Sequence, residues 1–169
     1  FLVVSDSFRI ELLAGQDRAG FTSGVEPLDR YLKAQAGQDM RRRVSNCFVA
    51  VPDGAATVAG FYTLAAASIP VHDLPDDQTR RLPRYPVLPA ALIGRLAVDQ
   101  GFSGKQLGAT LLFDAMLRAL RAEPAVLTVI VDAKDDTTLA FYRHHGFQPF
   151  TARPSSLYLP VDTAAKLLR

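Results

Sequence analysis

The chain has 169 residues, of which 49% are hydrophobic and 21% are charged, and its formal net charge is +2. This length suits one domain, and the composition is that of an ordinary globular protein rather than of a disordered one. No apolar run approaches the roughly 18 residues that a membrane span requires, so we expect no membrane association.

Cysteine and histidine are scarce, which limits redox and metal chemistry. The single cysteine, Cys47, cannot form an internal disulfide, and three histidines without zinc-like spacing predict no metal site. The apolar segment around Cys47 favours a buried thiol over a nucleophile. Asp6, Arg9 and Glu11 interrupt the N-terminal apolar stretch, so we expect no signal peptide. Together these features predict a cytoplasmic protein.

The first half of the chain predicts three strands and one helix. Ser23 and Glu26 have the spacing of a capping box, in which the serine oxygen accepts an amide hydrogen bond at the start of a helix. The turn Pro52-Asp53-Gly54 joins the second and third strands into a hairpin. The expected strands are Phe8–Leu13, Asn46–Val51 and Thr57–Ala66, and the helix runs from Ser23 to about Ala36.

The second half predicts strands that alternate with helices. The proline-rich stretch Pro70–Pro89 indicates an irregular excursion with a single helical turn. Leu107, Leu111 and Ala115 form an apolar stripe on a long helix, and Gly146 can take the left-handed conformation that ends a short one. The expected elements are strand Ala90–Val98, helix Leu107–Arg121, strand Val126–Val131, helix Thr138–His145 and the late strands Phe147–Phe150 and Leu157–Leu159.

Strands therefore precede, interleave with and follow helices. This order predicts a mixed α/β (α+β) layered domain whose first half is largely antiparallel.

The sharpest local signal is a glycine-containing loop between a strand and a helix, over residues 98–108. Such a loop presents backbone N–H groups and a helix N-terminus to an anion. Gly104 and Gly108 would allow a phosphate to approach closely, and Lys105 adds positive charge. The segment is neither a Walker A loop nor a GxGxxG motif. Phosphate binding and an ordinary strand–turn–helix connection both stay open at this point.

A second signal is the segment from Phe141 to Phe147, which follows the buried strand. It contains Tyr142 on a short helix. A tyrosine in such a position is more often a packing residue than a catalytic one, and this segment alone leaves both interpretations open.

These two signals, in this order, resemble the GNAT superfamily of acyl-CoA-dependent N-acetyltransferases. The superfamily loop Gln/Arg-x-x-Gly-x-Gly/Ala corresponds to Ser103, Gln106 and Gly108, of which only the last keeps the pattern. The later pattern Asn-x-x-Ala-x-x-Phe-Tyr corresponds to Asp135–Tyr142, whose Phe-Tyr ending matches.

The resemblance implies a GNAT fold. Its central sheet is mixed and mainly antiparallel, is flanked by helices, and is splayed between the fourth and fifth strands, where the pantetheine arm of the cofactor enters. We expect one GNAT acetyltransferase domain over residues 1–169. Residues 1–7 fit no part of the pattern, and without an initiating methionine we expect them to be disordered or to come from a misassigned start.

A closer resemblance covers about Phe21 to Leu168. The phrases Leu82–Pro86, Ile93–Asp99 and Val131–Asp135 look like those of the GNAT-type toxins of bacterial toxin–antitoxin pairs. The resemblance implies transfer of an acetyl group from acetyl-CoA to the α-amino group of aminoacyl-tRNA, which blocks translation. It also implies a cognate ribbon–helix–helix antitoxin, contact with DNA only through that antitoxin, and a homodimer as is common among the relatives.

The resemblance also assigns the site residues. Tyr142 is the expected catalytic residue, which protonates the departing CoA thiolate, and a backbone N–H of the fourth strand is expected to stabilise the charge on the thioester oxygen. The residues expected to bind acetyl-CoA are Leu96, Ala97, Val98, Ser103, Gly104, Lys105, Gln106, Leu107, Gly108, Ala109, Asp135 and Phe141.

Arginine supplies 15 of the 19 positive charges, and its planar fork suits bidentate phosphate contacts. A tRNA acceptor requires a basic surface. The residues expected to contact RNA are Arg41, Arg42, Arg43 and Arg84. Arg95 either belongs to this basic set or is a buried ion-pair partner of Asp99 or Asp132.

Two alternative functions stay open. The first is a GNAT enzyme that acts on a protein or small-molecule amine. The second is a non-catalytic module that binds CoA or an antitoxin, which the departures at Ser103 and Gln106 would favour.

Overall fold

The computed structural model describes residues 7–168. The expectation of a disordered or misassigned segment over residues 1–7 therefore falls, except at Ser7, outside the described residues. The carbonyl of Ser7 accepts a hydrogen bond of 2.8 Å from the amide of Asp53, so this residue is tied to the hairpin turn.

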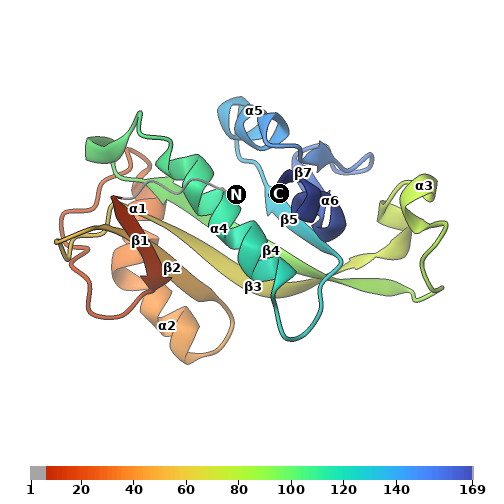
Figure 1. Cartoon of the computed structure of the whole chain (residues 1–169), viewed down its shortest axis with the longest axis horizontal. Helices are drawn as coiled ribbons and strands as arrows, with labels where there is room; N and C mark the ends of the chain where they lie inside the picture. The colour runs from red at the N-terminus through yellow and green to blue at the C-terminus, as the bar shows by residue number, and fades with distance from the viewer. Residues whose placement is uncertain (1–6, 169) are drawn as a thin grey trace. The chain divides into compact units, whose positions relative to one another are not determined.

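Seven strands and several helices make up the described part of the chain (Figure 1). The strands are β1 (Phe8–Leu12), β2 (Asn46–Pro52), β3 (Gly60–Pro70), β4 (Val87–Val98), β5 (Thr128–Asp132), β6 (Gln148–Pro149) and β7 (Ser156–Pro160). The helices are α1 (Glu26–Ala34), α2 (Ala36–Arg41), α3 (Asp76–Thr79), α4 (Leu107–Leu120), α5 (Asp136–His144) and α6 (Val161–Leu167), with short 3-10 turns η1 (Val71–Asp73) and η2 (Gln100–Phe102).

The strands form one sheet in the order β1-β2-β3-β4-β5-β7-β6. The pairs β1–β2, β2–β3, β5–β7 and β6–β7 are antiparallel, whereas β4 and β5 are parallel. The expected mixed, mainly antiparallel sheet flanked by helices is thus confirmed.

The chain divides into two compact units, which are described one at a time. Among the described residues, the first comprises residues 7–65, 93–115 and 168, and the second comprises residues 66–92 and 116–167. The strands β3 and β4 and the helix α4 each contribute residues to both units.

The core of the first unit lies between its strands and α1. Leu32, Val49 and Phe61 are fully buried there, and the rings of Phe21 and Phe61 meet edge to face at 5.6 Å between centroids. Gly60, at the start of β3, lies close to α4: a Cβ at this position would stand 2.9 Å from Leu111 Cδ1 and 3.1 Å from the Ala97 carbonyl oxygen. Glycine is therefore what lets α4 and the strands approach so closely.

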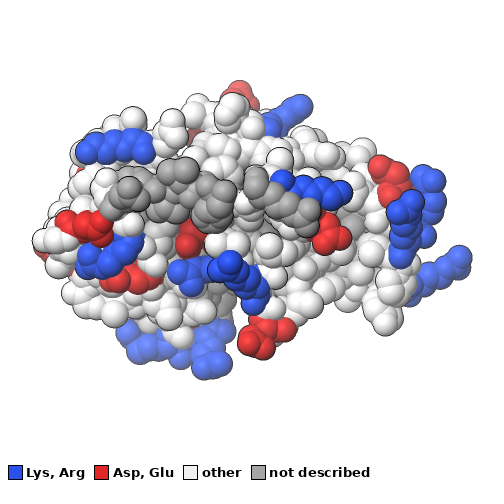
Figure 2. Space-filling view, in the orientation of Figure 1, with Lys and Arg blue, Asp and Glu red and all other residues white. Residues whose placement is uncertain are grey.

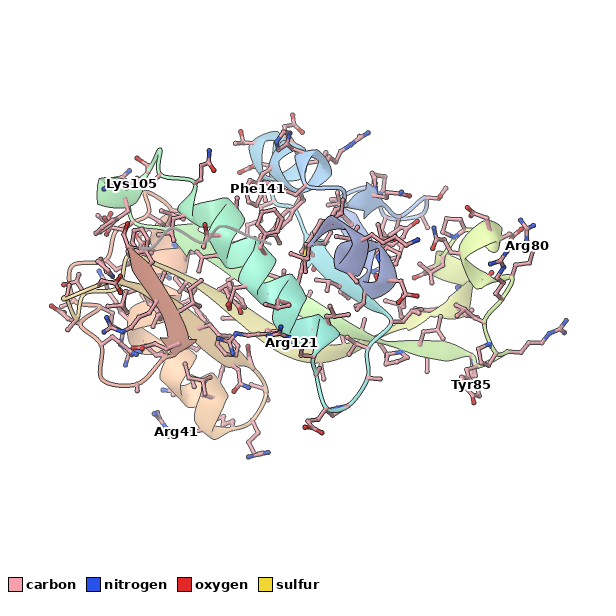
Figure 3. All side chains as sticks on the ribbon, viewed as in Figure 1. Arg41, Arg80, Tyr85, Lys105, Arg121 and Phe141 are labelled. Carbon is pink, nitrogen blue, oxygen red and sulfur yellow. The ribbon has the colours of Figure 1, made fainter. Side chains whose placement is uncertain are left out.

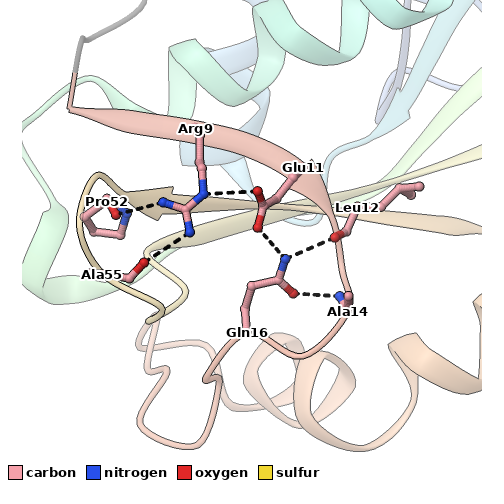
Figure 4. Close-up of polar contacts among 7 residues, drawn as sticks. All are labelled: Arg9, Glu11, Leu12, Ala14, Gln16, Pro52 and Ala55. Atoms are coloured by element: carbon pink, nitrogen blue, oxygen red, sulfur yellow. Dashed lines mark hydrogen bonds and ion pairs between the residues drawn. The ribbon is translucent and has the colours of Figure 1, made fainter.

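A polar network fastens the edge strand β1 to the hairpin turn (Figure 4). The Arg9 guanidinium donates to Glu11 at 3.1 Å and to the Ala55 carbonyl at 3.1 Å. Gln16 donates to the other Glu11 oxygen at 2.6 Å, and this bond is the main reason why the pKa of Glu11 lies below its ordinary value. The network holds the loop after β1 in place.

The core of the second unit lies around β7, the C-terminal end of β3 and the N-terminal end of β4. Ile69, Leu88 and Ala90 pack with Phe150 and Tyr158, whose ring centroids are 4.8 Å apart. On β5, Val129 and Val131 are buried on one face, whereas on the other Thr128 is buried and Ile130 is half-buried.

The expected capping box at the start of the first helix is wrong. The helix begins at Glu26 after Val25, without a side-chain cap. Ser23 Oγ instead donates to Asp29 Oδ1 at 2.6 Å, and Glu26 pairs with Arg30. The helical segment is also interrupted at Gln35, after which α2 continues to Arg41, a helix that the sequence analysis did not predict.

The other expected elements agree with the structure to within a few residues. The hairpin is confirmed with Cys47 opposite Thr63, and the excursion contains the single α-helical turn α3. Gly146 follows α5 with a φ of 97°, which is the left-handed conformation expected there. The helix α6 was not predicted.

Candidate functional site

The end of β4 leads into the candidate anion loop of the first unit. Ala97 is buried in the core that includes α1, whereas Leu96 and Val98 are half-buried. The amide of Asp99 donates to the Ala59 carbonyl at 2.8 Å. The Asp99 carboxylate accepts from the amides of Thr22 at 2.9 Å and Gly101 at 2.8 Å. Asp99 therefore anchors the loop at its entrance.

Two residues of this loop adopt left-handed backbone conformations. Gly104 has a φ of 77° and Gln106 a φ of 59°. Gln106 occupies the position where the superfamily pattern has glycine, and it takes the conformation that glycine prefers. Within residues 7–168, no hydrogen-bond acceptor is found for the amides of Gly104, Lys105 and Gln106. These N–H groups are free to bind an anion.

The loop ends at the N-terminus of α4, where Leu107 is buried and Gly108 is half-buried. The first turn of an α-helix has amides without intrahelical acceptors, and the helix dipole makes this end electropositive. The exposed Lys105 lies beside it, with its ammonium 5.6 Å from the Phe102 ring centroid (Figure 3). The arrangement can bind a phosphate-like group.

The second unit carries Tyr142 on α5. Its ring is buried, with the Phe141 and Phe147 ring centroids at 5.2 and 5.4 Å. No hydrogen bond of the hydroxyl is found within residues 7–168, and no fully buried side-chain oxygen of this part lacks a partner. The hydroxyl oxygen is therefore not fully buried.

Burial raises the pKa of Tyr142 well above its ordinary value, because the phenolate would lose hydration. The phenol is then protonated throughout the physiological pH range. Tyr142 can act as a hydrogen-bond donor to a group that approaches its hydroxyl.

The start of α5 is capped by Asp135, whose carboxylate accepts from the Thr138 amide at 2.8 Å. This bond is the main cause that lowers the pKa of Asp135. Phe141 is half-buried on the same helix (Figure 3). The His145 ring meets the Phe141 ring edge to face at 4.9 Å, and burial lowers the pKa of His145, with a smaller contribution from His144.

The arginines expected to contact RNA are all exposed. Arg41 ends α2, and Arg42 and Arg43 follow it. Figure 2 shows basic side chains gathered at the lower left, where Figure 1 places α2 and Figure 3 labels Arg41. Arg84 belongs to the second unit, in the excursion between β3 and β4.

The ion pair considered for Arg95 is not formed. The Arg95 guanidinium instead stacks on Tyr31, with Cζ 3.6 Å from the ring centroid. Asp99 accepts from backbone amides, as described above, and Asp132 accepts from Ser156 Oγ at 2.6 Å. Tyr31 could not be predicted as the partner of Arg95, because no local sequence pattern relates a residue of α1 to one of β4.

No helix within residues 7–168 is long and apolar enough to cross a membrane. The same part of the chain contains no group of three or more side chains arranged to hold a metal ion.

No family model matches the chain, but curated proteins do. It is 37% identical over 154 residues to a tRNA-acetylating toxin of Mycobacterium tuberculosis (strain ATCC 25618 / H37Rv), with 90% of each chain covered. It is 30% identical over 161 residues to a probable toxin TacT of Sinorhizobium fredii (strain NBRC 101917 / NGR234), with 90% of this chain and 89% of the relative covered.

Solved structures show the same fold. A tyrosine-to-phenylalanine mutant of KacT has a TM-score of 0.89, and AtaT complexed with acetyl-methionyl-tRNAfMet has one of 0.88. Each is 25% identical to this chain, and the match covers 96% of this chain and 99% of the other. AtaTR bound with acetyl-CoA has a TM-score of 0.83 at 25% identity, with 98% and 100% covered. The chain therefore belongs to the family of tRNA-acetylating toxins, the GNAT-type acetyltransferases of toxin–antitoxin systems.

Proposed function

We propose that this protein is a toxin that transfers the acetyl group of acetyl-CoA to the α-amino group of an aminoacyl-tRNA and thereby blocks translation. The observation that carries this proposal is the 37% identity, over 90% of the chain, to a tRNA-acetylating toxin. The similarity to AtaT in complex with acetyl-methionyl-tRNAfMet supports the same acceptor class.

Acetyl-CoA is the acyl donor in this proposal, as the similarity to acetyl-CoA-bound AtaTR supports. The diphosphate of CoA binds the amides of the loop from Ser103 to Ala109, beside Lys105. Residues Leu96 to Val98 contact the pantetheine and acetyl arm, with Asp135 and Phe141 as further contacts. The left-handed Gly104 and Gln106 and the free amides between them support this assignment.

The reaction needs little base catalysis. An α-amino group has a pKa of about 8, so a useful fraction is neutral at physiological pH and attacks the thioester carbon. The new N–C bond forms as the C–S bond breaks, and the ammonium proton is lost to water. A backbone N–H of β4 donates to the thioester oxygen while it carries negative charge.

Tyr142 is the proposed catalytic residue, whose hydroxyl donates a hydrogen bond to the departing thiolate. A free thiol has a pKa of about 8.5 and tyrosine one of about 10, and burial raises the latter further. Complete transfer from Tyr142 to a free thiolate is therefore uphill. The hydroxyl acts mainly through a hydrogen bond that strengthens as charge builds on sulfur, and water completes the protonation.

The proposed acceptor also explains the exposed arginines. Arg41, Arg42, Arg43 and Arg84 contact tRNA phosphates in this proposal, which places the protein in the cytoplasm, where charged tRNA occurs. A cognate ribbon–helix–helix antitoxin neutralises the toxin, and DNA is contacted only through that antitoxin. We also propose that residues 1–169 form one GNAT domain and that the protein forms a homodimer.

The test is incubation of the protein with labelled acetyl-CoA and a pool of charged tRNAs, followed by identification of the labelled species. We expect N-acetylated aminoacyl-tRNA and no label on uncharged tRNA. Label on ribosomal or other proteins, with none on charged tRNA, would refute the proposed acceptor.

A further inference from the structure

The side of the first unit covered by α1 carries an arginine without an acidic partner. Arg95 on β4 is half-buried and stacks on the Tyr31 ring at 3.6 Å. Within residues 7–168, its guanidinium forms no ion pair and no hydrogen bond. A guanidinium has five N–H donors, and no fully buried side-chain nitrogen within residues 7–168 lacks a partner, so the unpaired donors of Arg95 reach solvent. These donors are therefore available to a ligand.

The surroundings hold this guanidinium in place. The Tyr31 hydroxyl donates to Asp39 Oδ2 at 2.8 Å, and the Tyr31 ring stacks on Phe61 at 6.4 Å between centroids. The Tyr31 side chain is thus held at two points: its ring packs on Phe61, and its hydroxyl donates to the Asp39 carboxylate. A guanidinium stacked on a fixed ring has lost much of its rotamer freedom before any ligand binds.

The local charge favours an anion. Arg18, also half-buried, donates to the Leu32 carbonyl at 3.2 Å. Burial raises the pKa of the Cys47 thiol to about 12, and Arg18 and Arg95 act in the opposite direction. Both guanidiniums therefore lie close enough to influence one buried thiol. Two positive charges therefore act on the surroundings of this thiol.

We propose that Arg95 binds the phosphate of the 3′-terminal nucleotide of the charged tRNA. This inference rests on the proposed function. Consecutive strand residues point to opposite faces, so the residue before Leu96 can contact the acceptor while Leu96 faces the acyl arm. The terminal nucleotide carries both the aminoacyl ester and a 5′-phosphate, and the planar guanidinium fork suits a phosphate.

The test compares two small acceptors that differ only in this phosphate. One is adenosine aminoacylated on its ribose, and the other is the same compound with a 5′-phosphate. The amino acid is the one that the wild-type protein acetylates best on tRNA. Hydrogen bonds between charged groups predict a kcat/KM about tenfold to hundredfold higher for the phosphorylated acceptor.

Arg95→Ala should lower kcat/KM for the phosphorylated acceptor and leave kcat/KM for the unphosphorylated one unchanged. The ratio of kcat/KM with the phosphate to kcat/KM without it should therefore fall to about one. Arg95→Lys keeps the charge but not the fork and should retain part of the ratio. With intact charged tRNA, Arg95→Ala should raise KM and leave kcat nearly unchanged. Arg30→Ala is the matched control, because Arg30 lies on α1, is exposed and pairs with Glu26; its ratio should equal that of the wild type.

A folded Arg95→Ala variant that keeps the wild-type ratio would overturn the inference and leave Arg95 a packing residue of Tyr31. A wild-type protein that acetylates both acceptors equally would do the same. If Arg95→Ala does not fold, Arg95→Gln, which keeps a long polar side chain, carries the same comparison. A wild-type protein that acetylates no charged tRNA would instead refute the proposed function, so the two failures are distinguishable.

Discussion

Tyr142→Phe removes one hydroxyl and keeps the aromatic ring. The contacts of the ring with Phe141 and Phe147 stay in place, and no hydrogen bond of the hydroxyl is found within residues 7–168. The free energy of unfolding should therefore change by no more than about 0.5 kcal/mol. Thermal unfolding of the variant and the wild type measures this control directly.

The effect on the reaction should be much larger. Positioned acid–base groups contribute about 10²–10⁴-fold, which corresponds to about 3 to 5 kcal/mol in the activation free energy. Acetyl-CoA affinity should stay the same, because an interaction made mainly in the transition state does not strengthen ground-state binding. The assay is single-turnover acetylation of charged tRNA at saturating acetyl-CoA.

The pH dependence gives a second check. Because burial raises the pKa of Tyr142, the phenol should be protonated at every pH from about 6 to 9. The wild-type rate should rise as the acceptor α-amino group loses its proton near about pH 8 and then level off. Equal rates for the two proteins would refute this role for Tyr142, whereas a falling limb within this range that Tyr142→Phe abolishes would contradict its raised pKa.

Three further predictions concern the anion loop, the arginine cluster at the end of α2 and the buried cysteine. Gly108→Asp should weaken acetyl-CoA binding sharply in calorimetry, because the carboxylate repels the diphosphate, and it should leave the fold intact, because a carboxylate suits a helix N-terminus. Gly108→Ala is the uncharged control. Unchanged affinity of the aspartate variant would count against diphosphate binding at this loop. Replacement of Arg41, Arg42 and Arg43 by alanine should weaken tRNA binding and reduce its salt dependence, by about 0.9 or less in slope for each lost phosphate contact; an unchanged slope would mark the cluster as solvated surface. Burial raises the pKa of Cys47 to about 12, so stability present below about pH 9 should decline as the pH rises and the unfolded thiol ionises. Iodoacetamide should label the native thiol far more slowly than the denatured one at pH 8, and equal labelling would contradict its burial.

Elements with strong local signals were predictable from the sequence. The helix α4 has a regular apolar stripe, and the hairpin of β2 and β3 has a glycine turn. The helix start was predicted wrongly at Ser23, whose Oγ donates to Asp29 at 2.6 Å and accepts from the Val25 amide at 3.2 Å, before the helix begins. A capping pattern specifies that a serine oxygen can accept from a nearby amide, but not which amide it accepts from.

The candidate site also has features that local motifs predict and features that depend on long-range contacts. The loop and Tyr142 were predicted because each belongs to a contiguous motif with a known chemical use, and their roles remain predictions. The stacking of Arg95 on Tyr31 joins residues 64 positions apart, and the bond of 2.6 Å from the Tyr62 hydroxyl to Asp114 joins residues 52 apart. Contacts of this kind depend on how helices pack on strands, which no local pattern records.

The division into two units also has a consequence for how this protein could be cut or recombined. The chain passes from one unit to the other at 65/66, 92/93, 115/116 and 167/168. A single proteolytic cut therefore cannot separate the two units from each other, and a gene fusion that transplants one continuous segment cannot carry a whole unit without part of the other. Any version of this protein split at one point would leave at least one unit divided between the two fragments, which would have to reassociate to restore it.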